Sequence, residues 1–204
     1  MEVLRKITLI IIFAGFYNFI MAQDNIEVAF KNSYANEVKG EYSKAVNQMK
    51  KVYNASSYEI NIRLAWLSYE AGQYTESLAY YTKCSELRPL SIEALLGLTF
   101  PASAMGNWEK VIIAYKKVLK IDKYNYTANL RLGQIYLNRT EYKAADNYLQ
   151  LLLNMYPFTY DVVLNSAWNN YYMSKYREAK VLFERVMWLN PGDESAKSGL
   201  ENIK

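Results

Sequence analysis

The hydrophobic pattern along the chain returns with a period of about 34 residues. A short phrase, in which a small or polar residue is followed two positions later by an aromatic one, starts at positions 40, 72, 106, 140 and 174, at intervals of 32, 34, 34 and 34. Small or apolar side chains recur five, nine and twelve positions after each start, offsets that fall on one face of a helix. The phrases therefore predict five amphipathic helices, whose nine-position column reads Met49, Tyr81, Tyr115, Leu149 and Phe183.

A second periodic segment precedes each phrase and predicts a partner helix. Seven residues before four of the phrases stands a small side chain, which lets two helices pack closely; these residues are Ala65, Thr99, Gly133 and Ala167. Three prolines, Pro89, Pro157 and Pro191, end the second helix because proline and the residue before it leave helical geometry. The repeating unit is thus predicted to be a helical hairpin of about 34 residues.

Some positions depart from this pattern. Thr140 and Ser174 stand where the other phrases have glycine, which is tolerable if these residues keep a negative φ. Pro101 falls inside a first helix and predicts a kink there. The first unit is two residues short and has Asn32 and Ser33 where a leucine and a small apolar residue are expected, so its first helix is predicted to be shifted or to act as a cap.

The arrangement of small residue, glycine-aromatic turn, second small residue and terminal proline resembles the tetratricopeptide repeat family. This resemblance implies an all-α fold, a right-handed superhelical α-solenoid of about five helix-turn-helix hairpins with a C-terminal capping helix. Asp193 is the expected N-cap of that helix, and its polar outer face would carry Lys197, Glu201 and Lys204. The expected repeats are 26–57, 58–91, 92–125, 126–159 and 160–193, with the capping helix at 194–204.

Residues 1–22 have the order of a secretory signal: basic, then apolar, then small. The apolar run from Ile7 to Ala22 has 16 residues, which as a helix span roughly 24 Å and fall short of a ~30 Å hydrocarbon core. We expect cleavage after Ala22 and a mature domain at 23–204, with an uncleaved membrane anchor as the alternative. No cysteine follows the run, which excludes a bacterial lipoprotein anchor. The predicted location is the cell envelope, with a Gram-negative periplasm favoured, and membrane contact only through this segment.

Composition removes most catalytic chemistry. The chain has no histidine and one cysteine, Cys84, so it lacks Ser-His and Cys-His pairs, a disulfide and the usual zinc ligand sets. The net charge of +4 is too small to indicate nucleic-acid binding. We therefore expect no enzyme, no cofactor and no metal, with Cys84 as a buried, inert thiol.

The resemblance also implies a concave groove lined by the first helix of each hairpin. The groove positions lie mainly ten, six and three residues before each phrase, and they are largely apolar and aromatic. The candidates are Phe30, Tyr34, Ile62, Trp66, Tyr69, Leu96, Phe100, Leu130, Gln134, Leu164, Trp168, Tyr171 and Tyr172. These side chains either pack against neighbouring helices or form a channel for an extended peptide or a partner helix. Family members that clamp a chaperone carboxylate place lysine and asparagine in these columns, and that use is rejected here.

The predicted function is a non-catalytic exported scaffold that binds a protein or peptide ligand in this groove. An envelope module that binds glycan or lipid on the same aromatic side chains is the alternative. An enzyme built on Glu37 and Glu70 is a weaker possibility, because nothing in the pattern supplies a further reacting group.

Other charged residues are interpreted structurally. Acids near the starts of first helices are expected to stabilise the helix dipole; they are Glu27, Glu59, Glu93 and Asp161. A basic cluster is expected to be a solvated face; it comprises Lys116, Lys117, Lys120 and Lys123.

Overall fold

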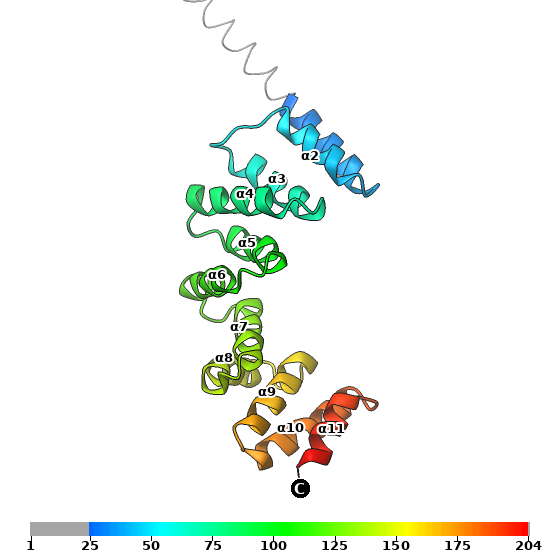
Figure 1. The fold of residues 1–204 in the computed structure, drawn as a ribbon, viewed down its shortest axis with the longest axis vertical. Helices are drawn as coiled ribbons and strands as arrows, with labels where there is room; N and C mark the ends of the chain where they lie inside the picture. Colours follow the sequence, from blue (N-terminus) through cyan, green and yellow to red (C-terminus); the bar gives the residue numbers. More distant parts are fainter. Residues whose placement is uncertain (1–24, 204) are drawn as a thin grey trace, which may run out of the picture. The chain divides into compact units, whose positions relative to one another are not determined.

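The computed structural model describes residues 25–203, and every regular element in that range is a helix. Residues 25–37 are helical and are followed by α2 (Tyr42–Lys50), α3 (Tyr58–Glu70), α4 (Tyr74–Leu87), α5 (Ile92–Ala104), α6 (Trp108–Ile121), α7 (Tyr126–Asn138), α8 (Tyr142–Met155), α9 (Tyr160–Tyr172), α10 (Tyr176–Leu189) and α11 (Glu194–Asn202) (Figure 1). The all-α prediction is confirmed. The predicted signal segment and Lys204 lie outside the described residues.

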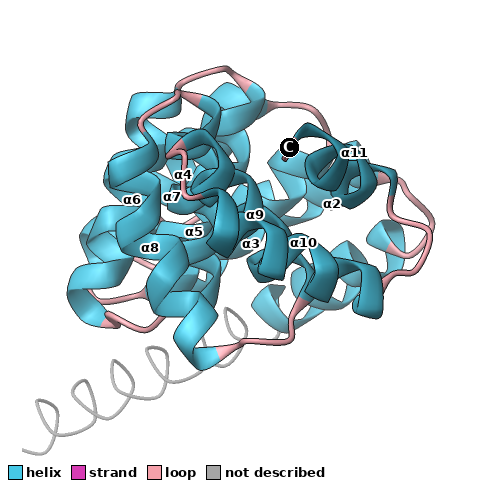
Figure 2. Cartoon of the chain, turned by 90° about the horizontal axis from the view of Figure 1, so that it is seen from below, coloured by secondary structure: helices cyan, strands magenta, loops and turns pink. Residues whose placement is uncertain are grey.

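The chain divides into two compact units, residues 1–108 and 109–204. Within the first unit, α3 packs on α2 and α4, and α4 packs on α5. In the second unit, α8 packs on α7 and α9, and α10 packs on α9 and α11. Helices and connecting loops account for the described fold (Figure 2). Between residues 25 and 203, no helix combines the length and apolarity needed to cross a membrane.

Side-chain caps fix where several first helices begin. The Ser57, Ser91 and Asn125 side chains each accept a hydrogen bond from the backbone N–H three residues on, at 3.3, 3.1 and 3.1 Å. Asp193 caps α11 in the same way, accepting from Ala196 N–H at 2.8 Å. An N-cap satisfies a donor that the helix itself leaves unpaired. The predicted capping role of Asp193 is confirmed.

The hairpin interiors follow the sequence pattern. All five residues of the nine-position column are buried. The small positions are buried too, and a Cβ at Gly133 would lie only 2.6 Å from a methyl carbon of Leu149. Ser77 shows the same proximity, because its hydroxyl donates to the Ala65 carbonyl at 2.7 Å. Close helix packing at these positions is confirmed.

The turn within each hairpin keeps one backbone conformation whether or not glycine is present. Gly72 has φ +74°, and Thr140 and Ser174 both have φ +60°. The expectation of a negative φ at Thr140 and Ser174 is wrong. The turn hydrogen bonds explain why: Thr140 N–H donates to the Leu137 carbonyl at 3.0 Å, just as Gly72 N–H donates to the Tyr69 carbonyl at 2.9 Å. This closure requires a left-handed residue, so the non-glycine side chains are held in a strained conformation.

The first hairpin is short because its second helix is short. Helix α2 has 9 residues, whereas α4 has 14. Ser33 is fully buried at the small-residue position, so the first helix keeps the register of the others rather than being shifted. Helix α5 runs through Pro101, and the kink expected there stays a prediction.

Candidate functional site

An open cavity of about 650 Å³ lies in the first unit, between helix 25–37, α3 and α5. Six of the candidate groove residues line it: Phe30, Tyr34, Ile62, Trp66, Leu96 and Phe100. They come from three successive first helices. The structure therefore brings all the candidates of the first unit except Tyr69 together around one hollow, which we call the aromatic groove.

A buried arginine organises one wall of the aromatic groove. Arg63 is 7% exposed, and its guanidinium lies 2.6 Å from a carboxylate oxygen of Glu37 and 3.0 Å from the Ser33 hydroxyl. The second oxygen of Glu37 accepts a hydrogen bond from Trp66 Nε1 at 2.7 Å. Charge-assisted bonds of this kind are short and directional. They hold the Trp66 ring in place across two repeats.

The same contacts set the charge state of Glu37. Partial burial acts to raise its pKa, but the hydrogen bonds from Arg63 and Trp66 and the arginine charge outweigh burial, so the pKa lies below its ordinary value. Glu37 is therefore ionised at neutral pH. Its carboxylate is engaged by Arg63 and Trp66 rather than by Glu70, which removes the support for a carboxylate pair.

Aromatic rings form the floor and rim of the groove. Trp66 and Phe100 meet edge to face at 6.4 Å between ring centroids, and Tyr69 lies 5.5 Å from Phe100. The Arg63 guanidinium stacks 3.7 Å from the centre of the Tyr34 ring. Tyr34 and Phe100 remain 53% and 43% exposed. These two rings present apolar surface that no neighbouring helix covers.

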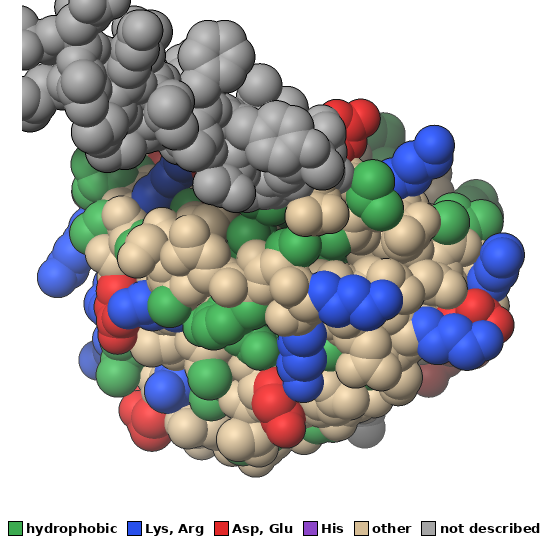
Figure 3. Space-filling model, turned by 90° about the horizontal axis from the view of Figure 1, so that it is seen from above, with side chains coloured by type: hydrophobic (Ala, Val, Ile, Leu, Met, Phe, Trp, Pro, Cys, Tyr) green, Lys and Arg blue, Asp and Glu red, His purple; other side chains and the backbone are tan. Residues whose placement is uncertain are grey.

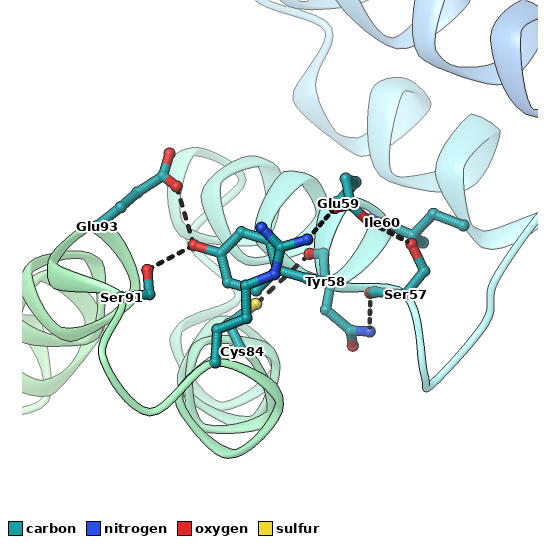
Figure 4. Close-up of polar contacts among 9 residues, drawn as sticks. Ser57, Tyr58, Glu59, Ile60, Cys84, Ser91 and Glu93 are labelled. Carbon is teal, nitrogen blue, oxygen red and sulfur yellow. Dashed lines mark hydrogen bonds and ion pairs between the residues drawn. The ribbon is translucent and has the colours of Figure 1, made fainter.

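Tyr58 also lines the groove, and its hydroxyl connects two successive repeats. Its hydroxyl lies 2.7 Å from the Ser91 hydroxyl and donates to Glu93 at 2.9 Å (Figure 4). Burial, together with the neighbouring Glu93 carboxylate, raises the pKa of Tyr58 to about 12. Arg88 stacks 4.4 Å from the centre of the Tyr58 ring. It also pairs with Glu59 at 2.7 Å.

Sequence reasoning missed both Arg63 and this tyrosine. A signal existed for the tyrosine, since Tyr58, Tyr126 and Tyr160 all stand fourteen residues before a turn. The Tyr160 hydroxyl donates to Asp193 at 2.5 Å, which repeats the Tyr58 contact 102 residues later. The signal for Arg63 was weaker: it is the single basic residue of α3, in a stretch that is otherwise mostly apolar.

The candidates of the second unit do not gather around one hollow as those of the first unit do, and several of them pack against neighbouring helices. Leu130 is buried, and Leu164 and Trp168 pack in the cluster that also contains Ala196 of the closing helix. Tyr171 meets Trp168 edge to face at 5.6 Å. Gln134 accepts from Arg131 at 2.9 Å.

Three rings of the second unit stack in a row. Tyr172 lies between Trp168, at 5.7 Å, and Tyr142, at 5.1 Å. The Trp168 Nε1 donates to the Ser195 hydroxyl at 2.8 Å. The three rings stabilise one another, and they also line a smaller open cavity of about 460 Å³, where Tyr172 remains 48% exposed.

The remaining candidates behave as expected from the sequence. Cys84 is fully buried, and burial together with the nearby Glu93 and Glu59 carboxylates raises its pKa to about 12. All four lysines of the basic cluster are exposed. On the face drawn in Figure 3, Lys and Arg side chains are scattered among acidic and hydrophobic ones. Over residues 25–203, no three His, Cys, Asp or Glu side chains gather as a metal ion would require.

Comparison with family models identifies two of the hairpins. Residues 58–89 and 127–159 each match a model described as tetratricopeptide repeat. A comparison with curated protein sequences found no match. The predicted tetratricopeptide repeats are thus confirmed for these hairpins.

Solved structures with the same fold extend this result over most of the chain. A tetratricopeptide repeat protein from Parabacteroides merdae is similar with TM-score 0.77 and 19% identity, over 88% of this chain and 72% of that one. The MamA protein is similar with TM-score 0.72 and 17% identity, over 81% and 92%. MamA from Desulfovibrio magneticus, residue 41 to the end, gives TM-score 0.66 and 16% identity, over 72% and 82%. Repeats of this fold are generally non-catalytic scaffolds that bind proteins.

Proposed function

We propose that the aromatic groove binds a short apolar segment of a partner protein, and that the chain acts as an exported, non-catalytic scaffold in the cell envelope. The observation that carries this proposal is the open cavity in the first unit, with Tyr34 and Phe100 exposed on its rim. Export rests on the signal-like order of residues 1–22.

The groove has the chemistry of a peptide site rather than of a reaction centre. Its rings offer apolar contact area, and the charges of Arg63 and Glu37 are paired with each other, so the pair shapes the wall without needing a charged ligand. Aromatic anchors in a partly formed pocket dominate the binding energy of such interfaces. Burying two rings of about 150 Å² each contributes roughly 7 kcal/mol before the cost of association. Association costs about 4 kcal/mol or more, so micromolar binding, at about 8 kcal/mol net, also requires contacts with the other side chains that line the groove.

A peptide selection tests the proposal directly. A displayed library of random peptides is selected on the full chain, and the affinity of enriched sequences is measured by fluorescence titration. We expect enriched peptides to share apolar side chains and to bind with about micromolar Kd. Phe100→Ala and Tyr34→Ala should each weaken binding about tenfold to thirtyfold.

The matched control is Trp188→Ala, which removes an exposed aromatic side chain from the second unit. It should leave the affinity unchanged. Equal affinity in wild type, Phe100→Ala and Tyr34→Ala would show that the groove is not the site. If the same variants instead lost affinity for soluble oligosaccharides that compete with the peptides, the glycan-binding alternative would replace the peptide one.

A further inference from the structure

The second unit has an apolar edge that the groove proposal does not use. Its helices α6, α8 and α10 end at three connections, and large apolar side chains stay exposed there. They are Ile121, Tyr124, Met155, Tyr156, Phe158, Tyr160 and Trp188. Phe158 is 59% exposed and Trp188 is 70% exposed. We call this set the loop edge.

Contacts join the three connections into one surface. Tyr126, which begins α7, meets Tyr156 after α8 edge to face at 5.1 Å. Arg185 of α10 donates to the Pro157 carbonyl at 3.0 Å, and the Tyr160 hydroxyl bonds to Asp193. The exposed side chains therefore lie along a continuous edge of the unit.

The turns at the opposite edge of the same unit are polar, although Tyr172 and Tyr176 beside the second turn are 48% and 49% exposed. Its two turns carry Arg139, Thr140 and Glu141 in one and Ser174 and Lys175 in the other. Both edges are made by connections of the same hairpins, but in this unit only the connections of the loop edge themselves carry exposed aromatic residues. The loop position is also periodic: the connections after α4, α6 and α8 carry Leu90, Tyr124 and Phe158, 34 residues apart.

Lysines border the loop edge. Lys117, Lys120 and Lys123 are exposed at the end of α6 and in the connection that follows. Within residues 25–203, none of the three forms an ion pair with a carboxylate. Asp122 between them accepts from Tyr124 N–H and from the Asn125 amide, which turns its charge into the loop. The end of α6 and the connection after it therefore carry a local excess of positive charge, whereas Asp161 and Glu194 are exposed acids at the other two connections.

We propose that the loop edge docks on an anionic lipid bilayer. Tyr and Trp side chains prefer the interface between water and hydrocarbon, and Phe and Met add apolar contact at shallow depth. Lysines beside them attract acidic headgroups. This binding is separate from the segment at residues 1–22 and uses no residue of the aromatic groove.

A site-specific label tests this docking in the full chain. The buried Cys84 leaves an introduced cysteine as the accessible thiol among residues 25–203, so Phe158→Cys can be labelled with an environment-sensitive fluorophore. Vesicles of phosphatidylglycerol and phosphatidylcholine should shift its emission to the blue, while vesicles of phosphatidylcholine alone should do so much less. The label reports on the edge itself, whereas total vesicle binding would also reflect the apolar run at Ile7 to Ala22.

The matched control places the same label on the opposite edge, at Asn138→Cys, which should show no shift. In the Phe158→Cys background, Lys120→Gln with Lys123→Gln should weaken partitioning into the anionic vesicles about tenfold to thirtyfold. An unshifted label at residue 158, or equal shifts at both label sites, would overturn the proposal. A shift that depends on protein concentration without vesicles would overturn it in favour of a second copy of the chain.

Discussion

Trp66 and Trp168 occupy the same position of the repeat, six residues before the turn, but they have different surroundings in the two units. Trp66 bonds backward to Glu37 of the preceding hairpin and lines an open cavity. Trp168 bonds forward to Ser195 at the start of the closing helix and packs in that helix's cluster. Both indoles are partly buried, but Trp66 lines the larger cavity, whereas Trp168 packs against the closing helix and borders a smaller one.

The difference shows that the repeat position alone does not decide which neighbours an aromatic side chain packs against. What decides it is the next element in the chain. Where a further first helix follows, Leu96 and Phe100 line the cavity beside Trp66. Where the closing helix follows, Ala196 and Gly199 bring its backbone close to Phe183. The experiments that follow break or sharpen this contrast, beginning with the largest expected effect.

Removing the Phe183 ring, which packs against Trp168, should destabilise the contact between α10 and the closing helix. Phe183 is fully buried, lies 4.9 Å from Trp168 between ring centroids, and fills the space where a Cβ of Gly199 would be. We expect Phe183→Ala to lower the free energy of unfolding of the second unit by about 3–5 kcal/mol, measured by urea denaturation. Val181→Ala on the exposed face of α10 should cost about 0.5 kcal/mol or less. A loss below about 1 kcal/mol for Phe183→Ala would mean that the closing helix does not depend on this packing.

Removing the Arg63 side chain from its contact with Glu37 should destabilise the first unit. Arg63→Met keeps the side-chain length but leaves Glu37 without its cation, and we expect a loss of about 2–3 kcal/mol in the free energy of unfolding. Lys83→Met breaks an exposed ion pair to Glu86 on α4 and should change the stability by about 0.5 kcal/mol or less. If the two variants lost the same amount of stability, the Arg63–Glu37 pair would contribute no more to the first unit than an exposed ion pair does.

The pH dependence of stability checks the same pair. The folded state lowers the pKa of Glu37 below its ordinary 4.5. The stabilisation is therefore fully present above that value and is lost as pH falls through the lower, folded-state pKa. In wild type, urea denaturation between pH 5 and acid should show this loss, and Glu37→Gln should remove it. A Glu37→Gln chain with an unchanged acid profile would contradict the assignment.

Much of the fold could be predicted from the sequence because the repeat is encoded locally. The spacing of small and bulky side chains fixed the hairpins, and the column through Met49 and Phe183 is buried as expected. The turn conformation at Thr140 was not predictable from residue type, since the closure of the hairpin overrides the local preference for negative φ. Periodicity describes what every hairpin shares, and it is least informative where one hairpin departs from the rest.

The candidate site was predictable only in part. The groove columns correctly gathered Phe30, Trp66 and Phe100 around one cavity. They gave no indication that Trp168 would pack against the closing helix, because that contact depends on how the closing helix is placed. Arg63 lies beside the groove columns, and its role depends on Glu37, 26 residues earlier. Pairings between repeats carry no periodic signal of their own.

The tyrosine contact between repeats is common to both units and should be sensitive to high pH. Tyr58→Phe removes the bonds to Ser91 and Glu93, and we expect a loss of about 1–1.5 kcal/mol. The folded-state pKa of Tyr58 is raised to about 12 from 10.0, so its stabilisation is complete below pH 10 and lost as pH rises toward 12. Alkaline denaturation should therefore be weaker in Tyr58→Phe than in wild type. Tyr74→Phe, at an exposed position, should retain the wild-type alkaline profile.

The smallest expected effect distinguishes the turns of the two units. The first unit uses Gly40, Gly72 and Gly106 at positive φ, whereas the second holds Thr140 and Ser174 at +60°. A non-glycine residue in this left-handed conformation costs about 1–2 kcal/mol. Replacing it by glycine removes that cost, but part of the benefit is lost because glycine has a larger conformational entropy in the unfolded state. Thr140→Gly should therefore raise the free energy of unfolding of the second unit by about 0.5–1 kcal/mol, measured by urea denaturation. Gly106→Ala should lower stability, since nothing lies within 4 Å of its Cβ position and only the backbone is strained. If Thr140→Gly destabilised the chain, the threonine side chain would be making a contact worth more than the strain it imposes.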